Sequence, residues 1–99
     1  MVKKRSKETI VYAILNACKD GVNSTRLMYA SGLNFAELKK YVELLISQGL
    51  IRGESRGKST YYYLTEKGIN ALTLLEKYLD LKSKEEEIVG QLRKLITFL

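Results

Sequence analysis

The sequence predicts a mainly α fold with one small β-hairpin, of the α+β class, that ends in a long helix. Three observations lead to this expectation. Apolar residues recur at helical spacing between residues 7 and 48. Residues 50–68 have the pattern of a strand, a basic glycine-containing loop, a second strand and a helix start. Residues 66–99 contain no proline and repeat apolar residues at alternating spacings of three and four.

The first helix is predicted to begin at Lys7 and to end at residues 20–21, where an Asp-Gly pair terminates it. Cys18, near its end, is expected to be a small core residue. Residues 22–23 are candidates for a very short third strand. The apolar residues that recur at helical spacing in this segment are Ile10, Ala13, Ile14, Ala17 and Cys18.

The next two helices are predicted to form a helix-turn-helix. Ser24 is the expected N-cap of a short helix over residues 25–30, and a tight glycine-containing turn follows it. Asn34 starts the longer third helix, because Glu37 follows in a capping-box arrangement, and Gly49 ends that helix. The side chains expected to point inward are Leu27, Met28, Leu38, Val42, Leu45 and Ile46.

A basic hairpin follows the third helix at once. Residues 55–59 supply turn-forming residues with Arg56 and Lys58 at the tip, and residues 60–64 are β-branched and aromatic. A helix-turn-helix followed by such a hairpin is a winged helix-turn-helix. Residues 7–68 are therefore predicted to form one winged helix-turn-helix domain.

The second strand of this wing alternates between two faces. Tyr62 is expected to share the core face with Leu64, whereas Tyr61 and Tyr63 face outward. Structural packing is the expected role of at least one of these rings. Thr65 follows the strand and is placed to cap the last helix.

The predicted last helix covers residues 66–99 and would be about 51 Å long at 1.5 Å per residue. Its heptad seam has Glu85 as the only polar member, so a coiled coil with a second chain is expected. A second stripe, formed by Ile69, Leu72, Leu75 and Leu79, is expected to cover the winged domain. The seam residues assigned to dimerisation are Leu74, Tyr78, Leu81, Ile88, Leu92, Leu95 and Leu99.

An alternative places a break in this helix. Ser83 and Glu86 could form a capping box that restarts a separate helix, which would fold back on the domain. The continuous helix is preferred, because residues 79–82 contain no strong helix breaker. A lone rod would also expose several large apolar side chains near its end, and dimerisation removes that hazard.

The charge of the chain is concentrated in its front part. The chain has 17 Lys and Arg against 11 Asp and Glu, a net charge of +6. Residues 1–68 hold 12 cations and 6 acids, whereas residues 69–99 hold 5 of each. A basic field of this kind attracts phosphate polyanions, so double-stranded DNA is the expected partner of the winged domain.

If the third helix enters a major groove, its lysines reach phosphates or guanine, and Asn34 either reads an adenine edge or serves only as the helix cap. The cap is favoured, and Glu37 and Glu43 dilute the charge on this face. Arg56 and Lys58 are the strongest candidates, because a narrow hairpin can place an arginine in or beside a minor groove. The residues predicted to contact DNA are Lys3, Lys4 and Arg5 in a basic arm over residues 1–6, and Arg26, Asn34, Lys39, Lys40, Arg52, Arg56 and Lys58.

The composition offers little for catalysis. The chain has no histidine, Cys18 is its only cysteine, and no phosphate-loop glycine pattern is present. We therefore expect neither an enzyme nor a metal, a cofactor or a small-molecule ligand. No signal peptide follows Met1 and no apolar run approaches about 18 residues, so a cytoplasmic, nucleoid-associated protein without a membrane partner is expected.

Two segments carry a resemblance to a known family. They are TRLMYASGLNFAELKKYVELLISQGLI at residues 25–51 and YYYLTEKG at residues 61–68. With these segments the chain resembles the archaeal winged-helix proteins of small chromatin type, the "ten-a" family of ten-kilodalton Sulfolobus DNA-binding proteins, over nearly its whole length. The resemblance implies a homodimer joined by an antiparallel coiled coil of the last helices, which binds duplex DNA with little sequence preference. The positions that it carries over are Asn34, Lys39, Lys40, Arg56 and Lys58.

The leading hypothesis is a DNA-binding architectural or regulatory dimer with two separated duplex sites. One alternative is a sequence-specific repressor that binds a palindromic operator. Another is a protein-interaction module, in which the winged domain contacts a different protein and the heptads only assemble it. That last alternative predicts no retention of duplex DNA at about 0.15 M salt.

Overall fold

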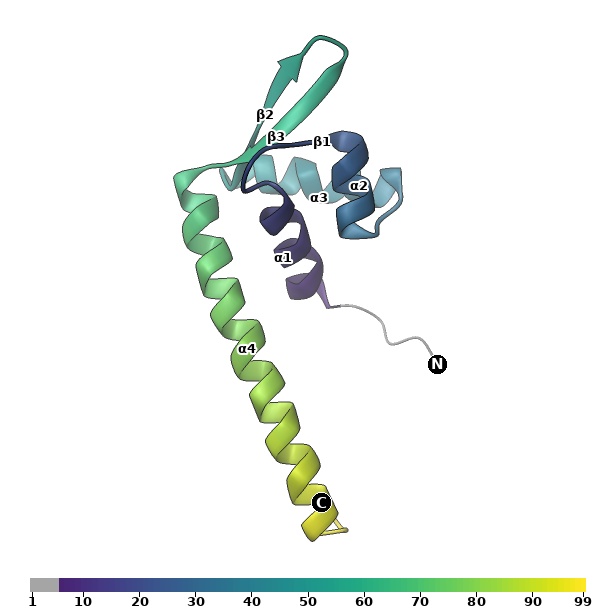
Figure 1. Cartoon of the computed structure of the whole chain (residues 1–99), viewed down its shortest axis with the longest axis vertical. Coiled ribbons are helices and arrows are strands. Elements are labelled where there is room, and N and C mark those ends of the chain that lie inside the picture. Colours follow the sequence, from purple (N-terminus) through teal and green to yellow (C-terminus); the bar gives the residue numbers. More distant parts are fainter. Residues whose placement is uncertain (1–5) are drawn as a thin grey trace.

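The computed structural model describes residues 6–99 and has the predicted mainly α fold with a small sheet (Figure 1). The elements are α1 (Lys7–Ala17), β1 (Val22–Asn23), α2 (Ser24–Ser31), α3 (Phe35–Ser47), β2 (Ile51–Arg56), β3 (Ser59–Leu64) and α4 (Glu66–Leu95). The sheet is antiparallel with strand order β1-β3-β2, so β3 is its central strand. The hairpin of β2 and β3 extends from the helical body in the direction opposite to α4 (Figure 1).

Asparagine side chains are the N-caps of two helices, α2 and α3. Asn34 caps α3 as predicted, since its Oδ1 accepts a hydrogen bond from the backbone N–H of Glu37 at 2.8 Å. The prediction for α2 was wrong by one residue, because Asn23 rather than Ser24 is the N-cap and accepts from the N–H of Arg26 at 2.8 Å. Asn23 has the extended backbone of β1, which is the conformation that an N-cap requires.

The core lies where the three helices of the body meet the base of the sheet and the first half of α4. Cys18 is fully buried there, as predicted, and Tyr62 and Leu64 pack against the core from β3. Gly68 and Leu72 are the buried residues of α4. The largest fully buried side chains are Ile14, Leu15, Leu27, Ile51 and Cys18.

Two residues predicted to face the body are instead exposed. Ile46 on α3 is 43% exposed and Ile69 on α4 is 54% exposed. Each follows a buried position, Leu45 and Gly68 respectively, and successive helical residues are separated by roughly 100°. Both isoleucines therefore point about a quarter turn away from the face that the core covers.

A Schellman motif fixes the end of α3. Gly49 has a φ of 74°, in the left-handed region that favours glycine. Its N–H donates to the carbonyl oxygen of Ile46, and the N–H of Leu50 donates to that of Leu45, both at 2.9 Å. The motif ends the helix and directs the chain into β2.

Thr65 joins the start of α4 to the end of α3. Its Oγ1 donates to the carbonyl oxygen of Gly49 at 2.5 Å, and its backbone N–H donates to that of Leu50 at 3.1 Å. The Nζ of Lys67 donates to the carbonyl oxygen of Gln48 at 2.7 Å. Three consecutive carbonyl groups after α3 are thus bonded to the residues that open α4.

The first turn of α4 lies directly on the backbone of Leu50. The N–H of Gly68 donates to Oγ1 of Thr65 at 3.0 Å, which completes the predicted N-cap. A Cβ atom at Gly68 would lie 2.0 Å from the carbonyl oxygen of Leu50. Only glycine therefore allows this approach, although its φ is not in the left-handed region.

Helix α4 is uninterrupted over 30 residues, so the alternative of a second helix that restarts near residues 83–86 is wrong. Its length is about 45 Å at 1.5 Å per residue. The helix ends at Leu95, and Leu99 lies beyond it, contrary to the prediction. Ile96 and Thr97 are β-branched and favour the helix weakly, and the last carbonyl groups of a helix lack partners within it.

Replacing Gly68 by alanine is expected to lower the free energy of unfolding by about 2–3 kcal/mol, because the new Cβ must displace the backbone of Leu50. Gly53→Ala is the matched control, since its Cβ would meet nothing closer than 3.4 Å. The control should change stability by no more than about 0.5 kcal/mol. Urea unfolding at equal chain concentration measures both variants, and wild-type stability of Gly68→Ala would contradict the contact.

Candidate nucleic-acid interface

The hairpin has longer strands and a tighter turn than predicted. Strand β2 pairs with β3 as far as Arg56 opposite Ser59, which leaves only Gly57 and Lys58 in the turn. The prediction of a loop over residues 55–59 was therefore wrong. Gly57 has a φ of 60° and Lys58 does not have a positive φ, as in a type II′ turn with glycine at its first central position. Lys58 lies at the tip, and Arg56 is the last residue of its strand.

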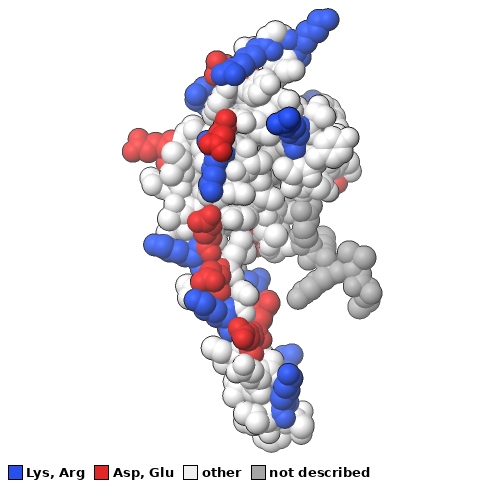
Figure 2. Space-filling view, in the orientation of Figure 1, with Lys and Arg blue, Asp and Glu red and all other residues white. Residues whose placement is uncertain are grey.

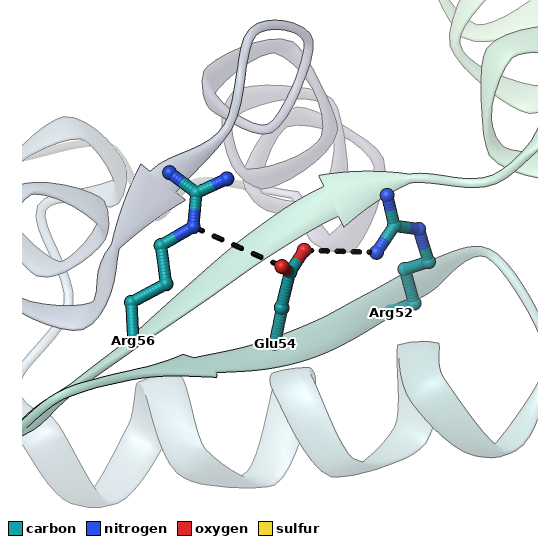
Figure 3. A network of polar contacts seen from close by, with 3 residues as sticks. All are labelled: Arg52, Glu54 and Arg56. Carbon is teal, nitrogen blue, oxygen red and sulfur yellow. Dashed lines mark hydrogen bonds and ion pairs between the residues drawn. The ribbon is translucent and has the colours of Figure 1, made fainter.

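Three charged side chains of β2 stand on one side of the hairpin, with Glu54 between Arg52 and Arg56 (Figure 3). Oε2 of Glu54 is 3.3 Å from Nη1 of Arg52, and Oε1 is 3.9 Å from Nε of Arg56. The guanidinium of Arg52 lies 4.7 Å from the ring centre of Tyr63, and that of Arg56 lies 5.1 Å from that of Tyr61. These five residues, here named the wing cluster, confirm that Tyr61 and Tyr63 face outward.

The wing cluster orients its arginines without burying them. The side chains of Arg52 and Arg56 remain 58% and 55% exposed, so each ion pair contributes at most about 1 kcal/mol. Glu54 offsets one of the two positive charges. Its role was not identified from the sequence, although the alternation of strand residues places it on the same face as both arginines. The cluster is a preorganised pair of cations with guanidinium groups still accessible to phosphate.

Helix α3 offers fewer free polar groups than its sequence suggested. Lys39 and Lys40 are exposed, as is Arg26 on α2. The Oδ1 atom of Asn34 accepts the cap bond from Glu37, and a bidentate contact to adenine would need that same oxygen. The geometry therefore favours the cap as the role of Asn34.

An apolar groove of about 300 Å³ lies between α3 and the base of the hairpin. Phe35, which is 67% exposed, and Ile46 line it together with Tyr62 of β3. Lys39 and Glu43 are its charged members. Phe35 was not among the predicted site residues. The sequence could have indicated its exposure, because Phe35 directly follows the helix cap and lies outside the buried stripe of α3.

Charged side chains are distributed unevenly over the described residues. Figure 2 shows cations along the hairpin at the top of the view, and acids mixed with cations down α4. One of these mixed pairs joins Asp80 and Lys84 at 3.1 Å. The predicted arm residues Lys3, Lys4 and Arg5 lie outside the described residues, and their role stays a prediction.

The predicted dimer seam is exposed along the part of α4 that leaves the body (Figure 1). By contrast Leu72, on the face toward the body, is only 4% exposed. An exposed helical stripe that is apolar except for Glu85 is typical of a surface that binds another protein. The exposed seam residues within the helix are Leu74, Tyr78, Leu81, Ile88, Leu92 and Leu95.

The single cysteine is poorly placed for chemistry. Burial raises the pKa of the Cys18 thiol to about 12, so it is protonated near neutral pH and is a poor nucleophile. Among residues 6–99, no cluster of three or more His, Cys, Asp or Glu side chains could hold a metal ion. No helix within that range is both long enough and apolar enough to cross a membrane.

Known proteins share this sequence pattern and fold. The family described as winged helix-turn-helix matches residues 4–83. The fold is similar to that of Sso10a-2, a DNA-binding protein from Sulfolobus solfataricus, with a TM-score of 0.87 and 24% identity over 93% of this chain and 97% of that chain. It is also similar to the PcaV transcriptional regulator from Streptomyces coelicolor, with a TM-score of 0.65 and 18% identity over 91% of this chain and 79% of that chain.

A match in sequence covers a shorter segment. An uncharacterized protein of Methanocaldococcus jannaschii is 40% identical over 50 residues, which are 50% of this chain and 52% of that protein. The chain therefore spans about half the length of this curated relative. Together with the two solved structures, the family match confirms the winged fold predicted from the sequence.

Cys18 provides a test of the burial described above. Because its pKa is raised by burial, the thiol of the folded chain should resist iodoacetamide at pH 8, and unfolding in urea should expose it to rapid alkylation. Its contribution to stability should be fully present below pH 9.0 and decrease as pH rises toward 12, since the unfolded thiol ionises first. Mass spectrometry measures the rate of alkylation. Equal rates for the folded and unfolded chains would contradict the burial of Cys18.

Proposed function

The chain belongs to the winged helix-turn-helix family, and on this basis we propose that it is a dimeric, architectural DNA-binding protein of low sequence specificity. Residues 7–68 bind the duplex and α4 joins two chains, in a non-catalytic, nucleoid-associated role. One observation carries the proposal most directly. Cations occupy the hairpin and α3, whereas an unpaired apolar seam occupies the part of the molecule that extends in the opposite direction.

The wing is proposed to make the principal contacts to DNA. Lys58 at the turn and Arg56 at the strand end can reach a minor groove or its phosphates, because a two-residue turn keeps the hairpin narrow. Arg52 is held by Glu54 and Tyr63 farther from the tip, where it can contact the phosphate chain. Since Glu54 offsets part of the charge, the wing neutralises few phosphates and binding depends on salt to a moderate degree.

The remaining cations are assigned to phosphates rather than to bases. Lys39 and Lys40 on α3 and Arg26 on α2 are exposed and suited to this role. Phosphate contacts position a protein on the duplex but carry no sequence information. The cap bond of Asn34 removes one means of reading adenine, which supports low specificity. The basic arm at residues 1–6 would add further phosphate contacts.

Two chains are proposed to associate in antiparallel orientation along the seam. A parallel pair in register would bring the two basic domains together at one end, where their positive charges repel. An antiparallel pair relieves this repulsion, because the basic domains then lie at opposite ends of the particle.

The dimer would therefore carry two separate duplex-binding surfaces. Helix α4 is about 45 Å long, which sets the scale of their separation. Adjacent half-sites on one duplex lie about 34 Å apart. A dimer of this size can bridge two duplexes or span more than one helical turn of a single duplex.

A sequence-specific repressor is the second candidate. It is favoured by the likeness to the PcaV transcriptional regulator, which extends over most of this chain. Footprinting in the presence of competitor DNA separates the two candidates. Protection of one sequence supports the repressor, and uniform protection supports the architectural protein.

Replacing Arg56 or Lys58 by alanine is expected to weaken duplex binding severalfold and to reduce the slope of log affinity against log salt by about 0.9 in each case. Each change removes one cation from the wing. Lys84→Ala, which removes a cation from the middle of α4, is the matched control and should change neither quantity. Fluorescence anisotropy at several salt concentrations provides both values, and unchanged affinity and slope in both wing variants would refute the wing contacts.

Ile88→Glu is expected to convert the dimer into a folded single chain, because it places a charge in the apolar seam at a position that is exposed in one chain. Gln91→Glu adds the same charge beside the seam, and this control should remain dimeric. Sedimentation equilibrium measures the mass of each. The seam assignment is wrong if Ile88→Glu retains the mass of two chains.

A further inference from the structure

The N-terminus of α3 presents two exposed apolar residues, followed by the exposed carboxylate of Glu37. In a helix-turn-helix, the N-terminal residues of the second helix are the ones that approach base edges. Here these residues are Asn34, Phe35 and Ala36. The oxygen of the Asn34 side chain accepts the cap bond from Glu37 at 2.8 Å, and Phe35 and Ala36 carry no polar side-chain atom. Both of these apolar residues are exposed.

Phe35 is also part of a larger apolar surface. It lines the groove between α3 and the hairpin with Ile46 and Tyr62, and Lys39 lies one turn after it on the same helix. The groove is lined by α3, by Ser24 at the start of α2 and by β3 of the wing. A winged domain that places α3 in a major groove would thus bring this surface toward the bases, with Lys39 at its border to meet a phosphate and Glu43 as its other charged member.

We propose that Phe35 packs against thymine C5-methyl groups in the major groove and gives the protein a preference for thymine-rich duplexes. The thymine methyl is the apolar feature of that groove, and phenylalanine is among the side chains that contact it. The inference rests on the proposed function, because it needs a duplex on α3. The preference should amount to about fourfold for each methyl group covered, which is compatible with low sequence specificity.

The test compares two duplexes of identical sequence, one with thymine and one with deoxyuridine, which lacks only the methyl group. Wild-type protein should bind the thymine duplex at least about fourfold more tightly by fluorescence anisotropy, the factor for one covered methyl group, and Phe35→Ala should bind both equally. Because the Phe35 side chain is 67% exposed, this variant should fold, which circular dichroism verifies. Leu44→Ala is the matched control, since Leu44 is 59% exposed on the same helix but does not line the groove, and it should discriminate as wild type does.

The comparison also separates the methyl contact from other effects of the substitution. If Phe35→Ala discriminates as strongly as wild type, the methyl acts through duplex shape and the inference is overturned. Equal binding of both duplexes by wild type overturns it too, as expected if the groove holds an apolar peptide, and leaves the proposed DNA binding intact. Failure of wild type to retain either duplex overturns both the inference and the proposed function.

Discussion

The hydroxyl group of Thr65 connects the three elements on which the rest of the structure depends. It donates to the carbonyl oxygen of Gly49, just after α3, and accepts from the N–H of Gly68 in α4, and Thr65 itself directly follows β3 of the hairpin. Close contact between Gly68 and Leu50 holds the same elements together through van der Waals packing. The direction of the wing and the direction of the long helix are thereby fixed relative to α3.

Contacts beyond this junction support the short hairpin from the body of the domain. Two strands alone are marginally stable in water, but here β3 also pairs with β1. The ring of Tyr63 lies against Gly21 on one side of the sheet, and the guanidinium of Arg52 stacks over the same ring. The cations of the wing are therefore presented from a supported sheet, and their position follows that of α4. In a dimer, the two wings would then be placed by the helix that joins the chains.

The sequence predicted what depends on local chemistry and periodicity. The buried stripes, the cap at Asn34, the cap at Thr65 and the outward faces of Tyr61 and Tyr63 follow from residue type and spacing. The choice between two neighbouring residues for one role was harder to predict. Asn23 and Ser24 are both good N-cap residues for α2, and only the pairing of β1 decides between them. Ile46 was predicted to be buried because it is apolar, but its position on α3 turns its side chain away from the core.

Features that depend on contacts between distant segments could not be predicted. The need for glycine at residue 68 arises from Leu50, which is far away in sequence. The bridge from Glu54 to two arginines, and the exposed ring of Phe35 in a groove completed by Tyr62, require the arrangement of the folded chain. These features largely determine how much charge and how much apolar surface the domain presents to DNA.

The central claim is tested most directly by the number of chains and duplexes in the complex with a duplex of about 10 base pairs, because one helical turn has room for only one winged domain. Native mass spectrometry at low salt measures both numbers. Two chains with two duplexes are expected, since an antiparallel seam places one domain at each end of α4. Two chains on a single short duplex, or one chain alone on a duplex, would contradict a dimer with two separated DNA-binding surfaces.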